Sequence, residues 1–231
     1  MYYLQSRYYD PKICRFINAD SYTSTGQGPL GYNMFAYCLN NPIFRYDSNG
    51  RRTYVINGIG NDEEDDAPEY IKEFCVLLEE NDVDDAKAIP VYTGQSGAGI
   101  LKGIVQVVLE MCNIDVYTAY AYAYIMADLQ EAPLEEGEKL NIIGYSGGGQ
   151  IALNVAEKID EKVDNVILIG TPVMEILDGS AKVSLLYSYG DPFSWNVGFG
   201  FDSYCTGTGG HHSYFKNDLD STFTYVQAII G

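Results

Sequence analysis

Residues 141–150 read NIIGYSGGGQ, and this stretch decides the fold. An apolar run ends at Gly144, a single serine follows at Ser146, and glycines stand on both sides of that serine. Residues 148–160 then have the apolar spacing of a helix, so the stretch predicts a sharp turn from a buried strand into a helix. The serine in such a turn is either a plain turn residue or an exposed nucleophile. The rest of the sequence has to distinguish these two interpretations.

The neighbouring sequence alternates between predicted strands and predicted helices. Apolar, β-branched runs predict buried strands at residues 53–57, 88–92, 140–145, 163–170 and 182–189. Helical spacing of apolar residues predicts helices at residues 68–80, 97–112, 116–130, 148–160 and 218–230. Strands that alternate with helices imply a parallel sheet covered on both faces. We therefore expect an α/β fold, mainly parallel, with its site at the carboxyl ends of the strands.

The Gly-x-Ser-x-Gly spacing around Ser146 has a physical cause. Side chains two residues on either side of the serine would collide with neighbouring backbone, so Gly144 and Gly148 are expected to form the elbow. A serine hydroxyl needs a base that removes its proton, and that base is usually histidine. The two histidines of the chain, His211 and His212, stand together in a glycine-rich stretch before the last predicted helix, so both are candidate bases.

A carboxylate has to orient that histidine, and it should follow a strand that lies between the serine and the histidine in the sequence. Asp191 comes directly after the strand predicted at residues 182–189 and is the expected residue. Asp202 and Asp218 are less favoured substitutes. The turn-forming sequence Gly-Asp-Pro around Asp191 leaves a purely structural role for it as the alternative.

Acyl transfer also needs backbone donors for the developing oxyanion, each worth roughly 3–4 kcal/mol of the barrier. The N–H group of Gly147, at the amino end of the predicted helix, is expected to be one donor. The loop after the first strand normally supplies the other. We expect it to be the N–H group of Ile59, because Gly58 and Gly60 beside it allow a close approach of the backbone.

No metal or cofactor is expected. The five cysteines are scattered, form no CxxC or Cys/His pattern and are interpreted as free thiols. The acidic run Asn61–Glu69 lacks the ligand spacing of a Ca²⁺ loop. The aromatic, glycine-rich segment 192–210 is interpreted as a loop beside the nucleophile that serves as an acyl-binding wall, as a flexible lid or as a core anchor.

The charge of the chain excludes some partners. A net charge of −18 over 231 residues argues against nucleic acid and anionic membranes, because phosphate is bound by Lys and Arg. Residues 1–52 carry +3 and residues 53–231 carry −21, which predicts a domain boundary near residue 52. No apolar run approaches the roughly 18–20 residues that span a bilayer, and the start of the chain does not resemble a signal peptide. We expect a soluble chain without stable membrane insertion.

The first part of the chain contains YYLQSRYYDP, then RFINADS, then YNMFAYCLNNPIFRYDSNG. In this order the motifs closely resemble the end of the RHS-repeat-associated core, the segment that precedes variable C-terminal domains in bacterial Rhs and YD-repeat proteins. The resemblance covers residues 2–50, and it implies a remnant of that core ahead of an effector domain. Cys14 stands where the family has glycine, and Asp47 is followed by serine where the family has proline, so self-cleavage is not expected here.

Residues 53–231 resemble the α/β-hydrolase superfamily, in particular its compact lipase- and esterase-like members. The oxyanion loop, Ser146, Asp191 and a histidine occur in the family's order. Related sequences of this family have a His-x-x-Tyr-Phe pattern near the last helix. Here His211, Tyr214 and Phe215 are similar to that pattern, so the resemblance favours His211 over His212. It implies a serine hydrolase that cleaves carboxylic esters, acyl lipids among them, through an acyl-enzyme.

Other functions stay open at this point. A thioesterase or an acyltransferase uses the same residues. The Rhs resemblance implies, as another alternative, an effector such as a phospholipase toxin that is delivered as part of a larger protein and has an immunity protein as partner. A binding module with a disabled site is the alternative outside catalysis.

Overall fold

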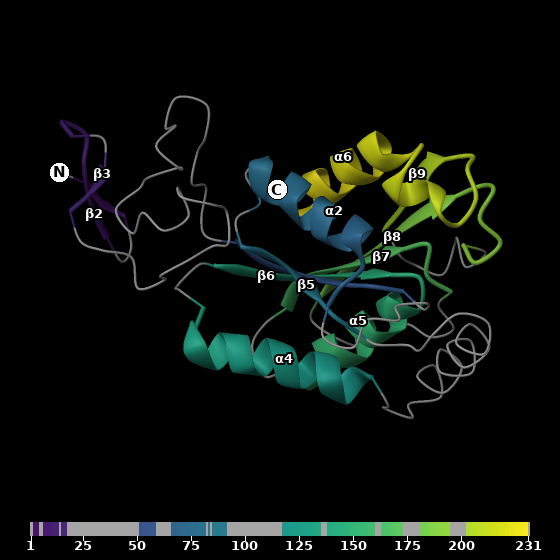
Figure 1. Cartoon of the computed structure of the whole chain (residues 1–231), viewed down its shortest axis with the longest axis horizontal. Helices are drawn as coiled ribbons and strands as arrows, with labels where there is room; N and C mark the ends of the chain where they lie inside the picture. The colour runs from purple at the N-terminus through teal and green to yellow at the C-terminus, as the bar shows by residue number, and fades with distance from the viewer. Residues whose placement is uncertain are drawn as a thin grey trace.

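Six parallel strands form the central sheet in the order β5-β4-β6-β7-β8-β9 (Figure 1). In this computed structural model their bounds are Arg51–Ile56 for β4, Ala86–Ile89 for β5, Lys139–Tyr145 for β6, Val163–Ile169 for β7, Lys182–Ser188 for β8 and Asp202–Gly207 for β9. The chain enters in β4, moves to the β5 edge and then passes to the other side of β4. The chain therefore adds β5 on one side of β4 and all later strands on the other side, so the strand order reverses between β4 and β6. Open parallel sheets have their binding crevice at such a point.

The structure describes residues 2–4, 7–13, 15–17, 51–58, 66–81, 83, 85–91, 117–134, 138–159, 163–172, 181–194 and 202–230. The helix predicted at residues 97–112 and the expected oxyanion donor Ile59 lie outside these ranges. Among the described helices, none is long and apolar enough to cross a membrane.

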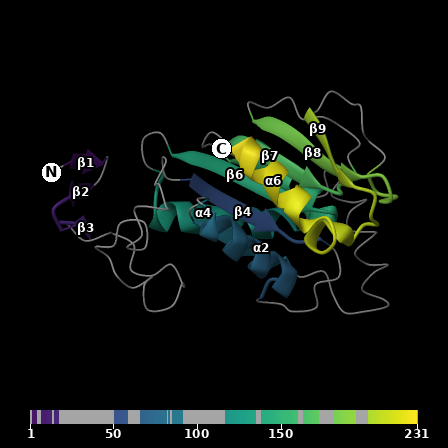
Figure 2. The ribbon, with the colours of Figure 1, turned by 90° about the horizontal axis from the view of Figure 1, so that it is seen from above.

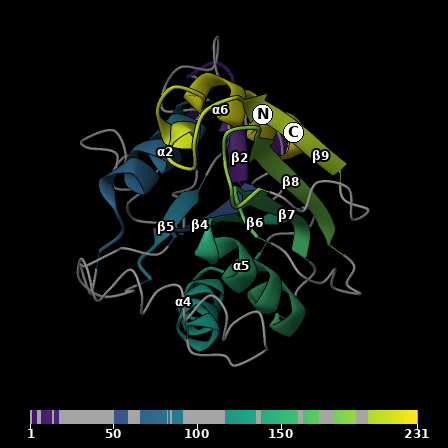
Figure 3. The ribbon, with the colours of Figure 1, turned by 90° about the vertical axis from the view of Figure 1, so that its right-hand side faces the viewer.

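Two pairs of helices cover the two faces of the sheet. Helices α4 (Thr118–Glu131) and α5 (Gly147–Lys158) pack against one face, and helices α2 (Glu69–Glu80) and α6 (Leu219–Ile230) against the other. Figure 1 shows the sheet between these two layers, and Figure 3 shows the same sandwich from its right-hand side. The predicted α/β fold with helices on both faces is therefore confirmed.

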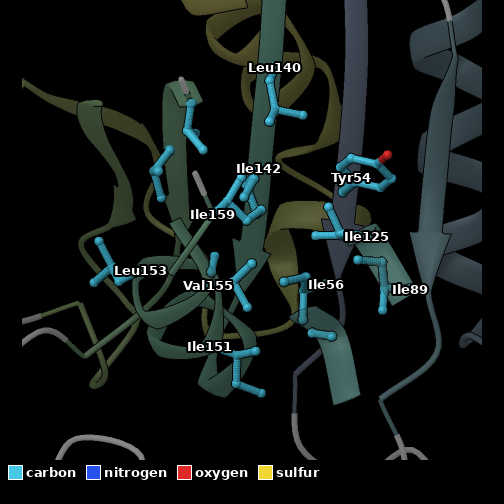
Figure 4. Packing of buried hydrophobic residues seen from close by; sticks show 14 of the residues in the cluster. Tyr54, Ile56, Ile89, Ile125, Leu140, Ile142, Ile151, Leu153, Val155 and Ile159 are labelled. Atoms are coloured by element: carbon cyan, nitrogen blue, oxygen red, sulfur yellow. The ribbon is translucent and has the colours of Figure 1, made fainter. Parts of the chain in front are cut away.

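The core explains why the strands read as continuous apolar runs. On β6, Ile142 packs into the α4–α5 layer and the next residue, Ile143, into the α2–α6 layer. Figure 4 shows the first layer, in which Ile142 of β6 and Ile151 and Val155 of α5 belong to one cluster. Because successive side chains of a strand point to opposite faces, a strand covered on both sides has to be apolar at nearly every position.

Two strands differ from the sequence-based expectation. Strand β5 ends at Ile89, whereas the prediction placed a strand at residues 88–92. Pro90 explains this end, since proline has no N–H group for the ladder. Strand β9 occupies part of the segment 192–210 that was interpreted as a loop, so that interpretation is wrong for Asp202–Gly207. Strand β9 lies at the edge of the described sheet, where it pairs with β8 alone, so its sequence can be polar. A search for apolar runs therefore does not find it.

The start of the chain forms a small sheet of its own. Strands β1 (Tyr2–Leu4), β2 (Arg7–Asp10) and β3 (Arg15–Phe16) pair antiparallel in this order, as Figure 2 shows together with the larger sheet. The turn signal at Asp10-Pro11 predicts brief strands and loops in this segment, and the three short strands agree with that prediction. The larger sheet begins with β4 at Arg51, slightly before the strand predicted from Thr53.

A buried cluster of charges closes the amino ends of β4, β5 and β6. The Arg52 guanidinium donates to the carbonyl of Ala132 and pairs with Asp85 at 3.0 Å and with Glu138 at 3.3 Å. The side chains of Arg52 and Glu138 are only 7% and 8% exposed. Asp128 of α4 adds a second centre, which accepts from the Tyr54 hydroxyl and from the Lys87 ammonium. The cluster therefore ties α4 to three strands.

Removal of the Arg52 charge tests this cluster. Arg52→Met removes a buried cation that pairs with Asp85 at 3.0 Å and with Glu138 at 3.3 Å, so we expect the free energy of unfolding to fall by about 3–5 kcal/mol, measured by urea denaturation. Lys182→Met is the matched control. Its pair with Asp202 has side chains 54% and 58% exposed, and an exposed pair contributes less than about 1 kcal/mol. Equal losses in the two variants would contradict a special role for the buried cluster.

Candidate active site

Ser146 lies at the carboxyl end of β6, directly before α5, in an unusual backbone conformation. Its φ of 53° and ψ of −125° fall in a region that residues with a side chain rarely adopt, at a cost of about 1–3 kcal/mol. The Ser146 N–H group donates to the carbonyl of Ile169 at 2.9 Å, which fixes the turn to the end of β7. Strain that the surrounding structure holds in place is common where a side chain has a functional task.

Glycines make this turn sterically feasible. A Cβ atom on Gly144 would overlap the backbone of Gly148 and Gly149, and one on Gly148 would lie 2.6 Å from the carbonyl oxygen of Ile56. The start of α5 therefore packs directly on the end of β6 and on β4. Gly144 and Gly148 are the two positions at which the sequence predicts this requirement.

The turn brings Ser146 to the expected histidine. The Ser146 Oγ lies 2.8 Å from Nε2 of His211, and Nδ1 of His211 lies 2.9 Å from Oδ2 of Asp191. Asp191 follows β8, and His211 lies between β9 and the short helix η2 (Ser213–Phe215). An ionised carboxylate only accepts hydrogen bonds, so Nδ1 carries the proton and Nε2 of the neutral ring accepts from the Ser146 hydroxyl.

Asp191 is buried and accepts several hydrogen bonds. Its Oδ1 accepts from the N–H group of Phe193 at 2.8 Å, and its Oδ2 also accepts from the hydroxyls of Ser194 and Tyr214 at 2.9 and 2.8 Å. Burial alone would raise the pKa of Asp191. Hydrogen bonds from His211, Phe193 and Tyr214 outweigh burial and hold this pKa below its usual value, so the carboxyl stays ionised at neutral pH.

The alternative candidates for the base and for the carboxylate lie away from Ser146. His212 is exposed, and its Nδ1 lies 3.2 Å from the hydroxyl of Tyr145. Asp202 pairs with Lys182, and Asp218 accepts from the hydroxyl of Ser213. Of the candidate bases and acids, the structure thus brings only His211 and Asp191 to Ser146 within the residues that it describes.

The side chain of Asn57 determines where the chain goes after β4. Its Oδ1 accepts from the N–H group of Val91 at 2.9 Å, and its Nδ2 donates to the carbonyls of Val91 and Gly58 at 3.0 and 2.7 Å. The amide thereby replaces the ladder bonds that Pro90 interrupts. Gly58 then lies so close to Ser146 that a Cβ atom on it would be 2.9 Å from the Ser146 Cβ. The sequence alone does not predict this role of Asn57.

The expected oxyanion donors can be placed only in part. Gly147 begins α5, so its N–H group is one of the unpaired donors at the amino end of the helix. Ile59 follows Gly58 and lies outside the described residues, so its role stays a prediction.

Aromatic rings contact the imidazole of His211. The Phe193 ring is 46% exposed and lies 4.7 Å from the His211 ring, centre to centre. The Tyr145 ring stacks on the His211 ring. Ser146 itself is only 9% exposed and is mostly covered, whereas the interpretation as a nucleophile expected an exposed serine. Within the described residues, no cluster of His, Cys, Asp or Glu is arranged to hold a metal ion.

Comparison with known proteins places the chain in a family. The model of the alpha/beta hydrolase fold matches residues 28–189. The match includes β4 to β8 and the turn at Ser146, begins before the predicted boundary near residue 52, and ends ahead of Asp191 and His211. No significant match was found among curated proteins.

Solved structures of similar fold include esterase PE8, with 13% identity and a TM-score of 0.56 over 79% of this chain and 94% of that chain. A dienelactone hydrolase-like promiscuous phosphotriesterase from metagenomic libraries has 13% identity and a TM-score of 0.51 over 79% and 85% of the two chains. A "predicted CIB-like hydrolase" from Thermoplasma acidophilum has 16% identity and a TM-score of 0.50 over 80% and 88%. At such identities the likeness concerns the fold alone. The match of the family model over most of the sheet shows that the chain belongs to the alpha/beta hydrolase fold family.

Proposed function

We propose that the protein is a serine hydrolase that cleaves carboxylic esters through an acyl-enzyme on Ser146. The observation that carries this proposal is the continuous hydrogen-bond chain from Ser146 through His211 to Asp191, with distances of 2.8 and 2.9 Å. Membership of the alpha/beta hydrolase family supports a hydrolase. Esterase PE8, which shares the fold, makes an ester the natural first substrate class to test.

In the proposed reaction, His211 acts first as a base and then as an acid. Its Nε2 takes the hydroxyl proton as the Ser146 Oγ attacks the carbonyl carbon, and the tetrahedral oxyanion forms. When the intermediate collapses, Nε2 gives that proton to the departing alkoxide, which leaves as an alcohol. A water molecule then attacks the acyl-enzyme by the same steps and releases the acid. Asp191 keeps the proton on Nδ1 and stabilises the imidazolium.

The oxyanion is proposed to be stabilised by the N–H groups of Gly147 and Ile59. The position of Gly147 at the amino end of α5 supports the first assignment, since a helix start stabilises negative charge. The close approach of Gly58 to Ser146 supports the second, because it brings the preceding part of that loop to the nucleophile. Phe193 adds an exposed apolar surface next to His211, which suits an apolar group of the ester.

The biological setting is also a proposal. The resemblance of residues 2–50 to the RHS-repeat-associated core favours delivery of the hydrolase as an effector domain within a larger protein, with an immunity protein as partner. A thioesterase or acyltransferase would use the same residues, and product analysis with water and alcohol acceptors separates them from an esterase.

The first prediction concerns the nucleophile. The wild-type protein is expected to hydrolyse p-nitrophenyl esters, assayed from acetate to palmitate, and to react with a fluorophosphonate probe. Ser146→Ala should lower kcat by at least about 10³-fold and abolish labelling, because no other group replaces the attacking oxygen. Ser184→Ala, which alters a buried serine of β8, is the matched control and should retain full activity. A folded protein with no Ser146-dependent turnover or labelling would refute the proposed function.

The second prediction concerns Asp191 and pH. Asp191→Asn should lower kcat about 10⁴-fold, because the amide favours the wrong tautomer of His211. The lowered pKa of Asp191 means that its ionised form stabilises the fold above the ordinary aspartate pKa of about 3.9, and this contribution is lost as the pH falls through the lowered value. The difference in unfolding free energy between wild type and Asp191→Asn should therefore be constant near neutral pH.

Urea denaturation at a series of pH values measures this difference, which should shrink only below about pH 4. Asp202→Asn, at an exposed ion pair, is the control and should give a small difference throughout. A difference for Asp191→Asn that already declines near pH 6 would show that the carboxyl does not have a lowered pKa.

The third prediction concerns Asn57. Asn57→Ala frees the segment that lies against Ser146, so we expect kcat to fall by about 10- to 100-fold while KM changes little. Asn165→Ala is the matched control, because Asn165 is also a buried asparagine and donates to Asn141 at 2.8 Å within the same sheet, near its other end. The two variants should lose similar stability. Equal kcat values for both would contradict a positioning role of Asn57.

A further inference from the structure

Tyr145 joins the strand that carries the serine to the loop that carries the histidine. It is the last residue of β6, directly before Ser146, and is 4% exposed. Its side chain points to the face of the sheet that α2 and α6 cover. The chain leads from β9 through η2 into α6, which packs on this same face (Figure 1), and the Tyr145 ring contacts His211 of that segment.

Tyr145 holds His211 at two separate places. Its ring stacks on the His211 ring with 5.1 Å between the centres and 22° between the planes. Its hydroxyl donates to the main-chain carbonyl of His211 at 2.8 Å. The first contact restricts the plane of the imidazole and the second restricts the backbone from which the imidazole extends. The His211 ring also contacts the Phe193 ring, with 4.7 Å between the centres and 61° between the planes.

The tyrosine is itself fixed by its surroundings. Three aromatic rings contact it at steep angles, with centre distances of 5.9 Å to Tyr70, 5.0 Å to Phe215 and 6.2 Å to Tyr214. Burial raises the pKa of the Tyr145 phenol, so its hydroxyl keeps the proton that it donates. Because its neighbours pack closely around it, the Tyr145 ring keeps the histidine loop at a fixed position relative to β6.

The Tyr145 hydroxyl also determines which ring nitrogen of His212 carries a proton. The only proton of the Tyr145 hydroxyl goes to the carbonyl of His211, so toward Nδ1 of His212, 3.2 Å away, the oxygen can only accept. His212 must then carry a proton on Nδ1 to complete the bond. The adjacent histidines thus have different tasks: His211 faces the serine, and His212 supports the tyrosine that holds His211.

We infer that Tyr145 is a positioning residue for the general base, and that His212 reinforces it through the tyrosine hydroxyl. The inference rests on the proposed function, in which His211 is the base. A hydrogen bond that only aligns a reacting group changes the rate of the chemical step and leaves substrate binding in the ground state nearly unchanged. The effect of its loss should therefore appear in kcat and not in KM.

Tyr145→Phe tests this role because it removes the hydroxyl and keeps the ring that stacks on His211. We expect kcat and the rate of fluorophosphonate labelling to fall about tenfold, with KM unchanged. His212→Ala should cause a smaller decrease of the same kind. In the double variant the two decreases should not add, since both variants break the same hydrogen-bonded unit.

Tyr54→Phe is the matched control, because it removes a buried hydroxyl that donates to Asp128 at 2.7 Å at the other end of the sheet. It should lower stability but leave kcat unchanged. If wild type turns over in a Ser146-dependent manner and Tyr145→Phe keeps its kcat, or if Tyr54→Phe loses as much kcat as Tyr145→Phe, the inference is wrong while the proposed function stands. If wild type shows no Ser146-dependent turnover, the proposed function fails, and the role of Tyr145 fails with it.

Discussion

The backbone of Ser146 is held in a conformation that almost only glycine adopts freely, and the geometry of the site depends on that turn. The chain can reverse so sharply only because Gly144 and Gly148 let β6, β4 and the start of α5 touch backbone to backbone. The Ser146 N–H group is bound to the end of β7, so the turn is held from both sides. The strained turn is thus held between β4, β6 and β7, whose residues are almost all buried.

The position of Ser146 determines where the segments of its partners, which are far away in the sequence, have to lie. Asp191 and His211 reach the serine because β8 and β9 follow β7 in the same direction and end at the same edge of the sheet. The buried Asp191 carboxylate is stabilised by donors from four side chains or amides, and one of these, the Tyr214 hydroxyl, comes from the same short helix that follows His211. The Tyr214 hydrogen bond therefore helps to keep Asp191 ionised and also fixes the loop of the proposed base.

The two ends of the sheet handle buried polar groups in different ways. At the amino ends, Arg52 and its carboxylate partners neutralise one another in a closed cluster. At the carboxyl ends, the polar groups are arranged in a directed chain that finishes at the Ser146 hydroxyl. Between them lies an apolar core in two layers, which lets the strands act as rigid connections. The cluster at one end can thus serve stability while the other end serves the chemistry that we propose.

The sequence by itself determined the strand-turn-helix unit around Ser146, the parallel sheet with helices on both faces, and Asp191 and the histidine pair as candidates. These signals are local, because an apolar run, a glycine pair or a Gly-Asp-Pro turn reports the conformation of its own segment. Strand β9 escaped prediction, since an edge strand with one neighbour needs no apolar pattern. The resemblance to the hydrolase family favoured His211, and the structure brings His211 rather than His212 to Ser146. The donors to Asp191 and the contacts of Tyr145 and Asn57 were decided only by the tertiary structure, because each depends on which atoms of distant segments come within hydrogen-bond distance.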